Sequence, residues 1–304
     1  MSAAAGMIFY IIPFCVFIAF LHILWYAYIK DNKHVQRSFS MAFYHKQAGD
    51  RSYTMAQSLD DPDTVHAFTS ACGGNSHVHI KGLNLGFRVQ DQPEDVLSNY
   101  RLVANDFDFS LNRTVLAKQT HTDHIRNVTE EDCGKGLTKC SDIEDTDGLI
   151  TDCPNIILVV FSADCIPILL SDPTNGVVAA IHSGWRGSVQ NIGGKAVQKM
   201  AADYHCDPKN IHAAIGPSIG PCCFEIGAEI VGQFQPAFVR DDHNGKFHVD
   251  LKEMVSKQLQ KEGVSENNID ISQECTMCKA GKYYSYRAQK EKTGRQAAFI
   301  FRKK

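Results

Sequence analysis

The chain has 304 residues, of which 44% are hydrophobic and 21% charged, and its formal net charge is −3. This length allows one large domain or two small ones with a substantial core. The weakly acidic balance and the lack of a Lys/Arg-rich stripe exclude the usual nucleic-acid-binding classes, so no nucleic-acid partner is expected. Eleven cysteines in a chain of this size fit a reduced cytosolic enzyme as well as an oxidising compartment.

An apolar run without a single charge occupies residues 7–29, with His22 as its only strongly polar side chain. A helix needs about 20 such residues to cross the hydrocarbon core of a membrane. Aromatic residues at the C-terminal end of the run suit the membrane interface. No basic residue precedes the run, which argues against a cleaved signal peptide. We therefore predict a transmembrane anchor within residues 1–30.

Basic residues flank this run on one side only, at Lys30, Lys33 and Arg37. The positive-inside rule then places the whole remaining chain in the cytosol. Glycosylation sequons at Asn112 and Asn127 would carry glycan only in a lumenal domain. Short sequons arise often by chance, so the flanking charge has more weight in this prediction.

The catalytic body is expected at residues 65–304, behind a polar and aperiodic linker at residues 31–64. Residues 65–69 predict a first strand, and residues 93–103 have helical spacing. The acidic, turn-rich stretch at residues 129–152 is typical of a solvated loop.

The most informative stretch lies at residues 161–190. Two apolar runs, residues 166–170 and 177–181, flank a turn and predict an antiparallel hairpin of buried strands. Cys165 precedes the first run and His182 ends the second, so the hairpin places both at one end of a sheet. Cys–His pairs serve metal binding, nucleophilic catalysis or only packing.

Further strands and helices follow without regular alternation. The patterns predict strands at residues 115–121, 211–215, 283–287 and 297–301 and helices at residues 192–204 and 250–263. This mixture favours an α+β fold with mixed sheets over a doubly wound fold. The GxGxxG, GxSxG and GxxxxGK[ST] motifs are absent, which argues against the common nucleotide-binding folds and hydrolases.

Four cysteines in the second half form two short patterns. Cys275-x-x-Cys278 resembles half a zinc ribbon or a redox motif, but no second C-x-x-C exists, so no structural zinc is expected there. Cys222 and Cys223 are adjacent, and adjacent side chains diverge in regular structure. We expect these two to pack rather than to bind a ligand.

Several short motifs follow one another in a characteristic order. They are Q-T-H at 119–121, S-A-D-C at 162–165, H-S-G-W-R-G at 182–187, G-P-S-I-G-P-C-C-F-E-I-G at 216–227, and C-T at 275–276 with Y-S-Y-R at 284–287. Together they resemble the laccase-domain (YfiH-like) family. Its members are zinc-dependent purine nucleoside phosphorylase and adenosine deaminase-like proteins, formerly called polyphenol oxidases. The resemblance covers residues 65–301.

This resemblance implies a zinc ion held by His121, Cys165 and His182, and a single catalytic domain of stacked mixed β-sheets flanked by helices. It also implies purine nucleosides as substrates and phosphate as co-substrate. The reactions would be phosphorolysis of adenosine, inosine and methylthioadenosine, and hydrolytic deamination of adenosine. Three protein ligands leave one zinc position open, as in catalytic sites. Zinc lowers the pKa of bound water to about 7, which suits attack on the purine C6.

Arg186 and Arg287 are candidates for holding phosphate or purine groups, because a guanidinium binds phosphate in a bidentate way; ordinary ion pairing is the alternative. Asp164 either orients a zinc ligand or caps a turn. Two positions depart from the family pattern: Ala71 and Ala288 stand where the family has arginines. If the first of these arginines grips phosphate, phosphorolysis is weakened here.

Three other functions compete with this interpretation. A copper polyphenol oxidase needs several H-x-H pairs, and this chain has one, His77 and His79. A cysteine hydrolase would use Cys165 as nucleophile and His182 as base, and metal content would separate it from a zinc enzyme. A non-catalytic, membrane-tethered interaction protein would keep the fold without an open zinc position.

Overall fold

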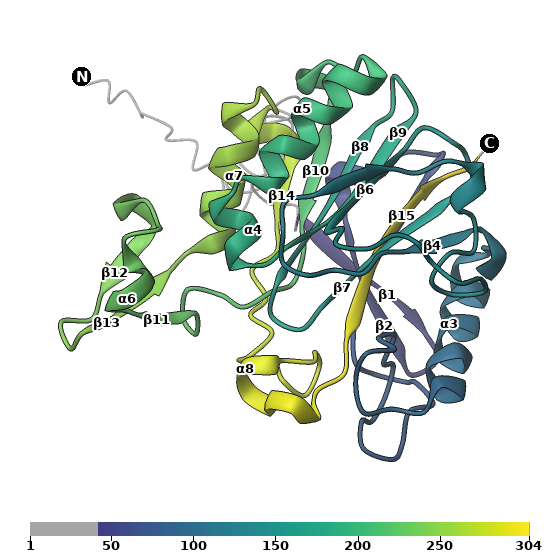
Figure 1. Cartoon of the computed structure of the whole chain (residues 1–304), viewed down its shortest axis with the longest axis horizontal. Coiled ribbons are helices and arrows are strands. Elements are labelled where there is room, and N and C mark those ends of the chain that lie inside the picture. Colours follow the sequence, from purple (N-terminus) through teal and green to yellow (C-terminus); the bar gives the residue numbers. More distant parts are fainter. Residues whose placement is uncertain (1–41, 304) are drawn as a thin grey trace, which may run out of the picture. The chain divides into compact units, whose positions relative to one another are not determined.

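Two six-stranded sheets carry the site, and each mixes parallel with antiparallel pairs (Figure 1). The structure is a computed structural model that describes residues 42–303. The first sheet has the order β1 (Phe43–Ala48), β2 (Arg51–Ala56), β3 (Thr64–Thr69), β15 (Gln296–Arg302), β7 (Ile157–Ser162) and β4 (Thr114–Leu116). The second has the order β14 (Ile269–Ile271), β10 (His212–Ile215), β8 (Ile166–Asp172), β9 (Val177–Ser183), β6 (Gly148–Thr151) and β5 (Ile125–Asn127).

Besides short 3-10 helices, the described chain has a small sheet and six α-helices. The small sheet has the order β11 (Glu225–Gly227), β13 (Lys246–Val249) and β12 (Val239–Asp241). The helices are α3 (Pro93–Phe107), α4 (Trp185–Val189), α5 (Ile192–Tyr204), α6 (Ala228–Val231), α7 (Leu251–Lys261) and α8 (Tyr286–Gln289). The predicted helices at residues 93–103, 192–204 and 250–263 correspond to α3, α5 and α7 and are confirmed.

An apolar interface joins the two large sheets. Leu158 and Ile300 of the first sheet share one buried cluster with Leu169 and Val178 of the second. The alternate side chains of β8 and β9 face the other way and pack against α5 and α7. In the first sheet, the outer face of β7 and β15 is covered by α3. These stacked mixed sheets with outer helices confirm the predicted α+β class, and the central strands read as continuous apolar runs because both faces are covered.

The hairpin predicted in the central stretch is confirmed. Strands β8 and β9 are antiparallel, with Ile166 opposite Ser183 and Pro167 opposite His182. Cys165 directly precedes β8. The hairpin therefore places Cys165 at the same end of the sheet as His182 of β9.

The linker expected at residues 31–64 is wrong for its second half. Residues 43–56 form the antiparallel hairpin of β1 and β2, and β3 begins at Thr64. These strands lie at the edge of the first sheet, and all six residues of β1 are partly or fully exposed. A half-exposed edge strand lacks the apolar run that identifies a buried strand, so its sequence reads as polar and aperiodic.

Two predicted strands are shorter or absent. The strand expected at residues 115–121 ends at Leu116, and the chain then turns toward the site. The strand expected at residues 283–287 does not form. Instead, the Ser285 side chain accepts a hydrogen bond from the Ala288 N–H and caps α8. A serine that satisfies a free N–H at a helix start favours the helix over an extended chain.

The predicted anchor at residues 7–29 lies outside the described residues. Within residues 42–303, no helix combines the length and the apolar character needed to cross a membrane. The anchor and the cytosolic orientation therefore stay predictions.

Candidate active site

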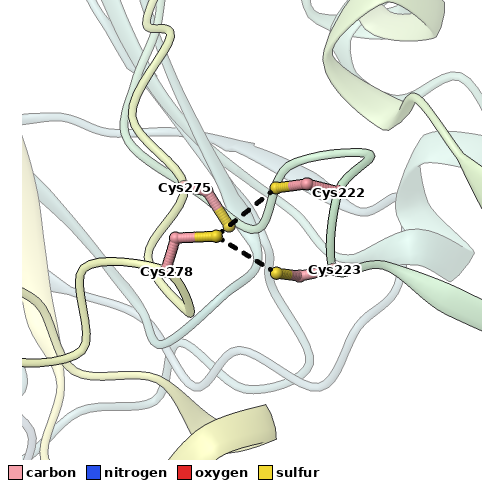
Figure 2. Close-up of side chains that lie close together, drawn as sticks. All are labelled: Cys222, Cys223, Cys275 and Cys278. Atoms are coloured by element: carbon pink, nitrogen blue, oxygen red, sulfur yellow. Dashed lines mark hydrogen bonds between the residues drawn. The ribbon is translucent and has the colours of Figure 1, made fainter.

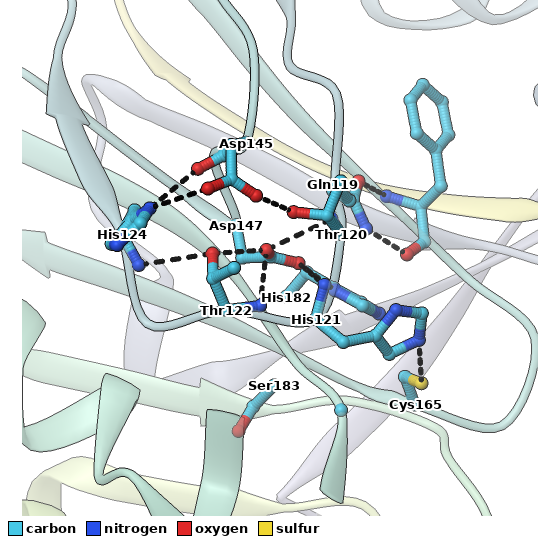
Figure 3. Close-up of polar contacts among 12 residues, drawn as sticks. Gln119, Thr120, His121, Thr122, His124, Asp145, Asp147, Cys165, His182 and Ser183 are labelled. Carbon is cyan, nitrogen blue, oxygen red and sulfur yellow. Dashed lines mark hydrogen bonds and ion pairs between the residues drawn. The ribbon is translucent and has the colours of Figure 1, made fainter. Parts of the chain in front are cut away.

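His121, Cys165 and His182 come together at one end of the second sheet (Figure 3). One ligand atom from each of the three lies within 4.8 Å of the other two. The Cys165 Sγ is 3.7 Å from the His121 Nε2. The two imidazole rings are 5.0 Å apart between centroids and nearly perpendicular, at 77°. The structure thus unites the three residues that the family resemblance indicated as zinc ligands.

Local backbone geometry allows this close approach. His121 has a positive φ of 67°, so the loop after β4 turns sharply and directs the imidazole toward the end of β9. Gly184 follows His182 by two residues, and a Cβ there would lie 2.6 Å from the His121 Cδ2 and 3.4 Å from the Cys165 Sγ. Only glycine leaves room for the His121 ring at this point.

Asp147 is the buried acceptor around which this site is organised (Figure 3). Its Oδ1 lies 2.6 Å from the His182 Nδ1 and also accepts the backbone N–H of His121 at 3.1 Å. Its Oδ2 accepts the N–H groups of Thr120 and Thr122, at 3.1 and 2.8 Å, and the Thr122 hydroxyl at 2.8 Å. One carboxylate therefore fixes the ring of His182 and the backbone that carries His121.

Sequence reasoning missed Asp147, which was one of several carboxylates in a stretch interpreted as a solvated loop. It contacts His182 because Gly148 pairs with Ile181 on the antiparallel strands β6 and β9. No motif of the sequence indicated this pairing. The signal appears only when the register of the two strands is known.

Burial and neighbouring charged groups shift the pKa values of this site in opposite directions, and the charged groups have the larger effect. Burial disfavours the Cys165 thiolate, but the two histidines outweigh burial and lower the pKa of Cys165 to about 6. Burial also disfavours an imidazolium at His182, but Cys165 and Asp147 raise its pKa to about 9. Burial opposes the Asp147 carboxylate as well, but His182 and Thr122 lower its pKa to about 2. These shifts favour the carboxylate form of Asp147, the imidazolium form of His182 and the thiolate form of Cys165.

The donor set fits a zinc ion. Two imidazoles and one thiolate are common zinc ligands, and the contact between Asp147 and the His182 Nδ1 leaves the Nε2 of that ring as the available ligand atom. Within residues 42–303, no fourth Cys, His, Asp or Glu joins this cluster. A metal held here would keep an open position, as catalytic zinc does.

The cluster lines a cavity of about 520 Å³, which is within the usual size range of small-molecule sites. Arg186 and Arg287 both line this cavity, as do Arg88, Arg295 and Lys118, which the sequence reading did not single out. Aromatic side chains form much of the remaining wall: Phe87, Phe161, Trp185, Phe224 and Tyr286. An apolar, cation-rimmed cavity suits a flat apolar ring attached to an anionic or polar group.

The two candidate arginines are held differently. The Arg186 guanidinium lies 4.3 Å from the ring centroid of Trp185 and is exposed. The Arg287 Nη1 donates to the carbonyls of Glu225 and Cys223, at 3.1 and 3.4 Å. Arg287 is therefore anchored on one side, with the rest of its guanidinium available to the cavity.

Asp164 joins neighbouring segments and orients neither histidine. Its Oδ1 accepts the Thr276 hydroxyl, and its Oδ2 accepts the backbone N–H of Arg287, both at 2.6 Å. Its φ is +90°, so it also forms the turn before Cys165. Of the two roles considered for Asp164, the structure supports the one in a turn.

Ala71 does not line the cavity. Ala71 and Val89 pack against Ile80, Ala163 and Tyr284. Of these five residues, Val89 and Ala163 line the cavity. The position is thus one layer of side chains away from the cavity.

The expectation that adjacent cysteines cannot face one site is wrong for Cys222 and Cys223. Their sulfurs lie 3.6 and 3.3 Å from the Cys278 Sγ. They occupy a tight turn, in which the N–H of Cys223 donates to the carbonyl of Gly220. A turn does not impose the alternating side-chain directions of a strand.

The sequence and the fold of this chain are similar to those of known proteins. A family model described as multi-copper polyphenol oxidoreductase laccase matches residues 65–303. The purine nucleoside phosphorylase YlmD of Geobacillus stearothermophilus is 35% identical over 247 residues, which cover 79% of this chain and 90% of that protein. The adenosine deaminase RL5, from an unknown prokaryotic organism, is 34% identical over 79% of this chain and 94% of its own. A crystal structure of YlmD from G. stearothermophilus aligns with a TM-score of 0.81 at 33% identity, covering 87% of this chain and 100% of that one. The chain therefore belongs to the laccase-domain (YfiH-like) family.

Proposed function

We propose that this protein is a zinc-dependent purine nucleoside enzyme. Its reactions would be phosphorolysis of adenosine, inosine and methylthioadenosine, and hydrolytic deamination of adenosine. The observation that carries the proposal is the convergence of His121, Cys165 and His182 on the wall of a cavity of about 520 Å³. Relatives named purine nucleoside phosphorylase and adenosine deaminase support the substrate class.

Phosphorolysis forms a bond between a phosphate oxygen and the C1′ of ribose and breaks the bond from C1′ to the purine nitrogen. The phosphate must be held against C1′, and the leaving base must receive a proton. Arg186 and Arg287 are the proposed phosphate ligands, because a guanidinium offers two parallel N–H donors to two phosphate oxygens. The aromatic walls of the cavity suit the flat purine.

Deamination replaces the amino group at C6 with an oxygen from water and releases that nitrogen as ammonia. When bound, zinc supplies activation of that water near neutral pH. The chain contributes the orientation: Asp147 fixes the tautomer and direction of His182, and the N–H bonds to Asp147 hold the loop that carries His121. His121, Cys165 and His182 line the cavity, so a zinc ion that they hold would supply its chemistry there.

A cysteine hydrolase is the second candidate, and one observation favours it. Cys165, His182 and Asp147 form a thiolate, imidazolium and carboxylate series of the kind that activates a nucleophile. This function gives no role to His121, whose Nε2 contacts the same sulfur. The proposal therefore favours the metal, which uses both imidazoles.

The test combines metal content with product analysis. The purified full chain is incubated with adenosine, inosine or methylthioadenosine, with and without phosphate, and free bases and nucleosides are separated by chromatography. His121→Ala, Cys165→Ala and His182→Ala should lose both the zinc of this site and activity. His124→Ala is the matched control, because His124 is an exposed histidine three residues from His121 that contacts Asp145.

The outcomes separate the candidates. Activity of the metal-free chain that disappears with Cys165→Ala would establish the cysteine hydrolase instead. Copper bound in preference to zinc would establish the oxidase. Zinc binding without any nucleoside turnover would leave the interaction protein, and retention of this zinc in any ligand variant removes that residue from the set.

The proposed location of the protein is a membrane. Residues 7–29 would anchor the chain there, with the enzyme domain on the cytosolic side. The support is the basic flank at Lys30, Lys33 and Arg37. Glycosidase treatment of the native chain should leave its mass unchanged. Glycan on Asn112 or Asn127 would place the domain in a lumen.

A further inference from the structure

Four cysteines form a second cluster, separate from the three residues of the active site (Figure 2). Cys222 and Cys223 come from the turn before β11, and Cys275 and Cys278 from the loop after β14. All four sulfurs lie within 4.8 Å of one another. Figure 2 shows the four side chains directed toward a common centre from two segments of the chain. All four are free thiols.

We propose that Cys222, Cys223, Cys275 and Cys278 bind a second zinc ion, in a structural site closed by four thiolates. A zinc–sulfur bond is about 2.3 Å long, so the sulfurs of a tetrahedral site lie about 3.8 Å apart. The separations from the Cys278 Sγ to the sulfurs of Cys223 and Cys222 are 3.3 and 3.6 Å, and none of the six exceeds 4.8 Å. The side chains therefore need only small movements to reach ideal coordination.

A disulfide accounts for this arrangement less well. It joins two sulfurs at about 2.05 Å and leaves the others unexplained. Here Cys278 lies near both Cys222 and Cys223, as in a cluster with one shared centre. Four thiols in tetrahedral array are typical of zinc or of iron–sulfur chemistry. Zinc is the simpler occupant, because one ion satisfies all four sulfurs.

Two groups beside Cys275 favour the negative charge that four thiolates bring. The N–H of Gly220 donates to the Cys275 Sγ at 3.2 Å. The Lys252 ammonium is buried and donates to the carbonyls of Ser272 and Glu274, at 2.6 and 2.8 Å, directly before Cys275. Zinc with four thiolates carries two negative charges, and an amide donor and a buried cation both stabilise them.

The cluster joins a segment that lines the active-site cavity, through Ile219 and Phe224, to the loop after β14, which does not line it. The N–H of Thr276 donates to the Ser218 carbonyl at 3.1 Å, and its hydroxyl donates to Asp164, next to Cys165. The Cys223 carbonyl accepts from Arg287. A metal at this point would fasten both segments together and so hold Asp164 and Arg287 in place.

The test counts metal ions in the full chain, purified under reducing conditions from zinc-supplemented cells. The unsubstituted chain should hold about two zinc ions, and Cys278→Ser and Cys222→Ser about one each. Cys140→Ser is the matched control, since Cys140 is an exposed free cysteine outside both clusters; it should keep about two. His182→Ala should keep the tetrathiolate ion and lose the other.

This design separates the two sites. An unsubstituted chain that holds a single zinc ion can hold it at either site. If that ion is at the four cysteines and the active-site zinc is absent, it is lost with Cys278→Ser and kept with His182→Ala. If the second site is wrong, the single ion is lost with His182→Ala and kept with Cys278→Ser. A chain without any zinc, or with iron at the four cysteines, also overturns the second site.

A spectroscopic measurement covers the case in which the cysteine variants do not fold. Cobalt(II) is exchanged into the His182→Ala chain, whose four-cysteine cluster is intact. Four thiolates should give intense sulfur-to-cobalt charge-transfer absorption and the ligand-field bands of a tetrahedral ion. A spectrum without these bands overturns the site.

Discussion

Asp147 directly precedes β6, and it contacts His182 of the paired strand β9 twice. The Asp147 Oδ1 lies 2.6 Å from the His182 Nδ1, and the Asp147 carbonyl accepts the His182 backbone N–H at 2.7 Å. Asp147 is fully buried and His182 is 3% exposed. The side chain and the backbone of one proposed zinc ligand are thus held by a single residue that directly precedes the neighbouring strand.

The first prediction concerns this pair. Asp147→Asn removes the carboxylate charge and one acceptor while keeping the size, so the Nδ1–H of His182 and the loop of His121 are held less firmly. Loss of such a supporting contact typically weakens metal binding by about 10- to 100-fold. Zinc affinity is measured by competition with a chromophoric chelator. Asp145→Asn is the control, because Asp145 is exposed and contacts His124 rather than a proposed ligand. Equal zinc affinity in Asp147→Asn and the unsubstituted chain would contradict this role.

The central part of the fold could be predicted from the sequence because burial leaves a plain signal there. Strands β8 and β9 are covered on both faces, so their sequences are unbroken apolar runs. The turn between them contains Pro173 and Gly176, which fixes a short hairpin. The position of Cys165 beside His182 followed directly from that hairpin.

The rest of the candidate site could not be predicted, because it depends on contacts between distant segments, which leave no local pattern in the sequence. Asp147 contacts His182 across 35 residues, and an isolated aspartate before a strand looks like any turn residue. His121 was placed by resemblance to a family, not by its own surroundings. Cys222 and Cys223 were misjudged because the rule for adjacent side chains holds for strands and fails in a tight turn.

A second prediction concerns Arg287. Its Nη1 is occupied by two backbone carbonyls, so the rest of the guanidinium is oriented without help from a substrate. Arg287→Met removes a charge-assisted contact, which costs about 1.5–3 kcal/mol, or about one to two powers of ten in affinity. The expected result is a higher KM for phosphate in the release of hypoxanthine from inosine.

The matched control for Arg287→Met is Arg240→Met, since Arg240 is exposed, pairs with Asp242 and lies outside the cavity lining. Arg287→Lys tests whether the two parallel N–H donors of the guanidinium are needed, because an ammonium keeps the charge without them. An unchanged phosphate KM in Arg287→Met would show that other cations of the cavity hold the anion.

A third prediction concerns acid stability and His66, which is fully buried in β3. Its Nε2 accepts the N–H of Ala56 at 2.9 Å, and burial lowers its pKa to about 4 from 6.5. The folded state keeps His66 neutral, so its stabilisation is complete above pH 6.5 and is lost as the pH falls toward 4. The interval between the two pKa values corresponds to about 3 kcal/mol in the free energy of unfolding.

The measurement for His66 is urea unfolding at several pH values, for the unsubstituted chain and for His66→Gln. Glutamine can accept the same N–H but does not titrate. The variant should be somewhat less stable at neutral pH, and its free energy of unfolding should fall less between pH 6.5 and 4. Parallel pH profiles for the two chains would assign the acid sensitivity to other groups.

The last prediction concerns the balance of the two proposed reactions and Ala71. This position has arginine in the family pattern, and here it packs one layer behind the cavity wall. If the family arginine binds phosphate, its absence here costs about 1.5–3 kcal/mol in phosphate binding, whereas deamination needs no phosphate. We expect adenosine deamination to persist and phosphorolysis to be weak. Ala71→Arg should raise phosphate-dependent base release by about one to two powers of ten and leave inosine formation nearly unchanged.

The control for this prediction is Ala71→Met, whose side chain is of similar length without charge, so it separates the effect of charge from that of crowding. Rapid base release by the unsubstituted chain at low millimolar phosphate would contradict the prediction, because Arg186, Arg287 or another cation would then already complete the anion site.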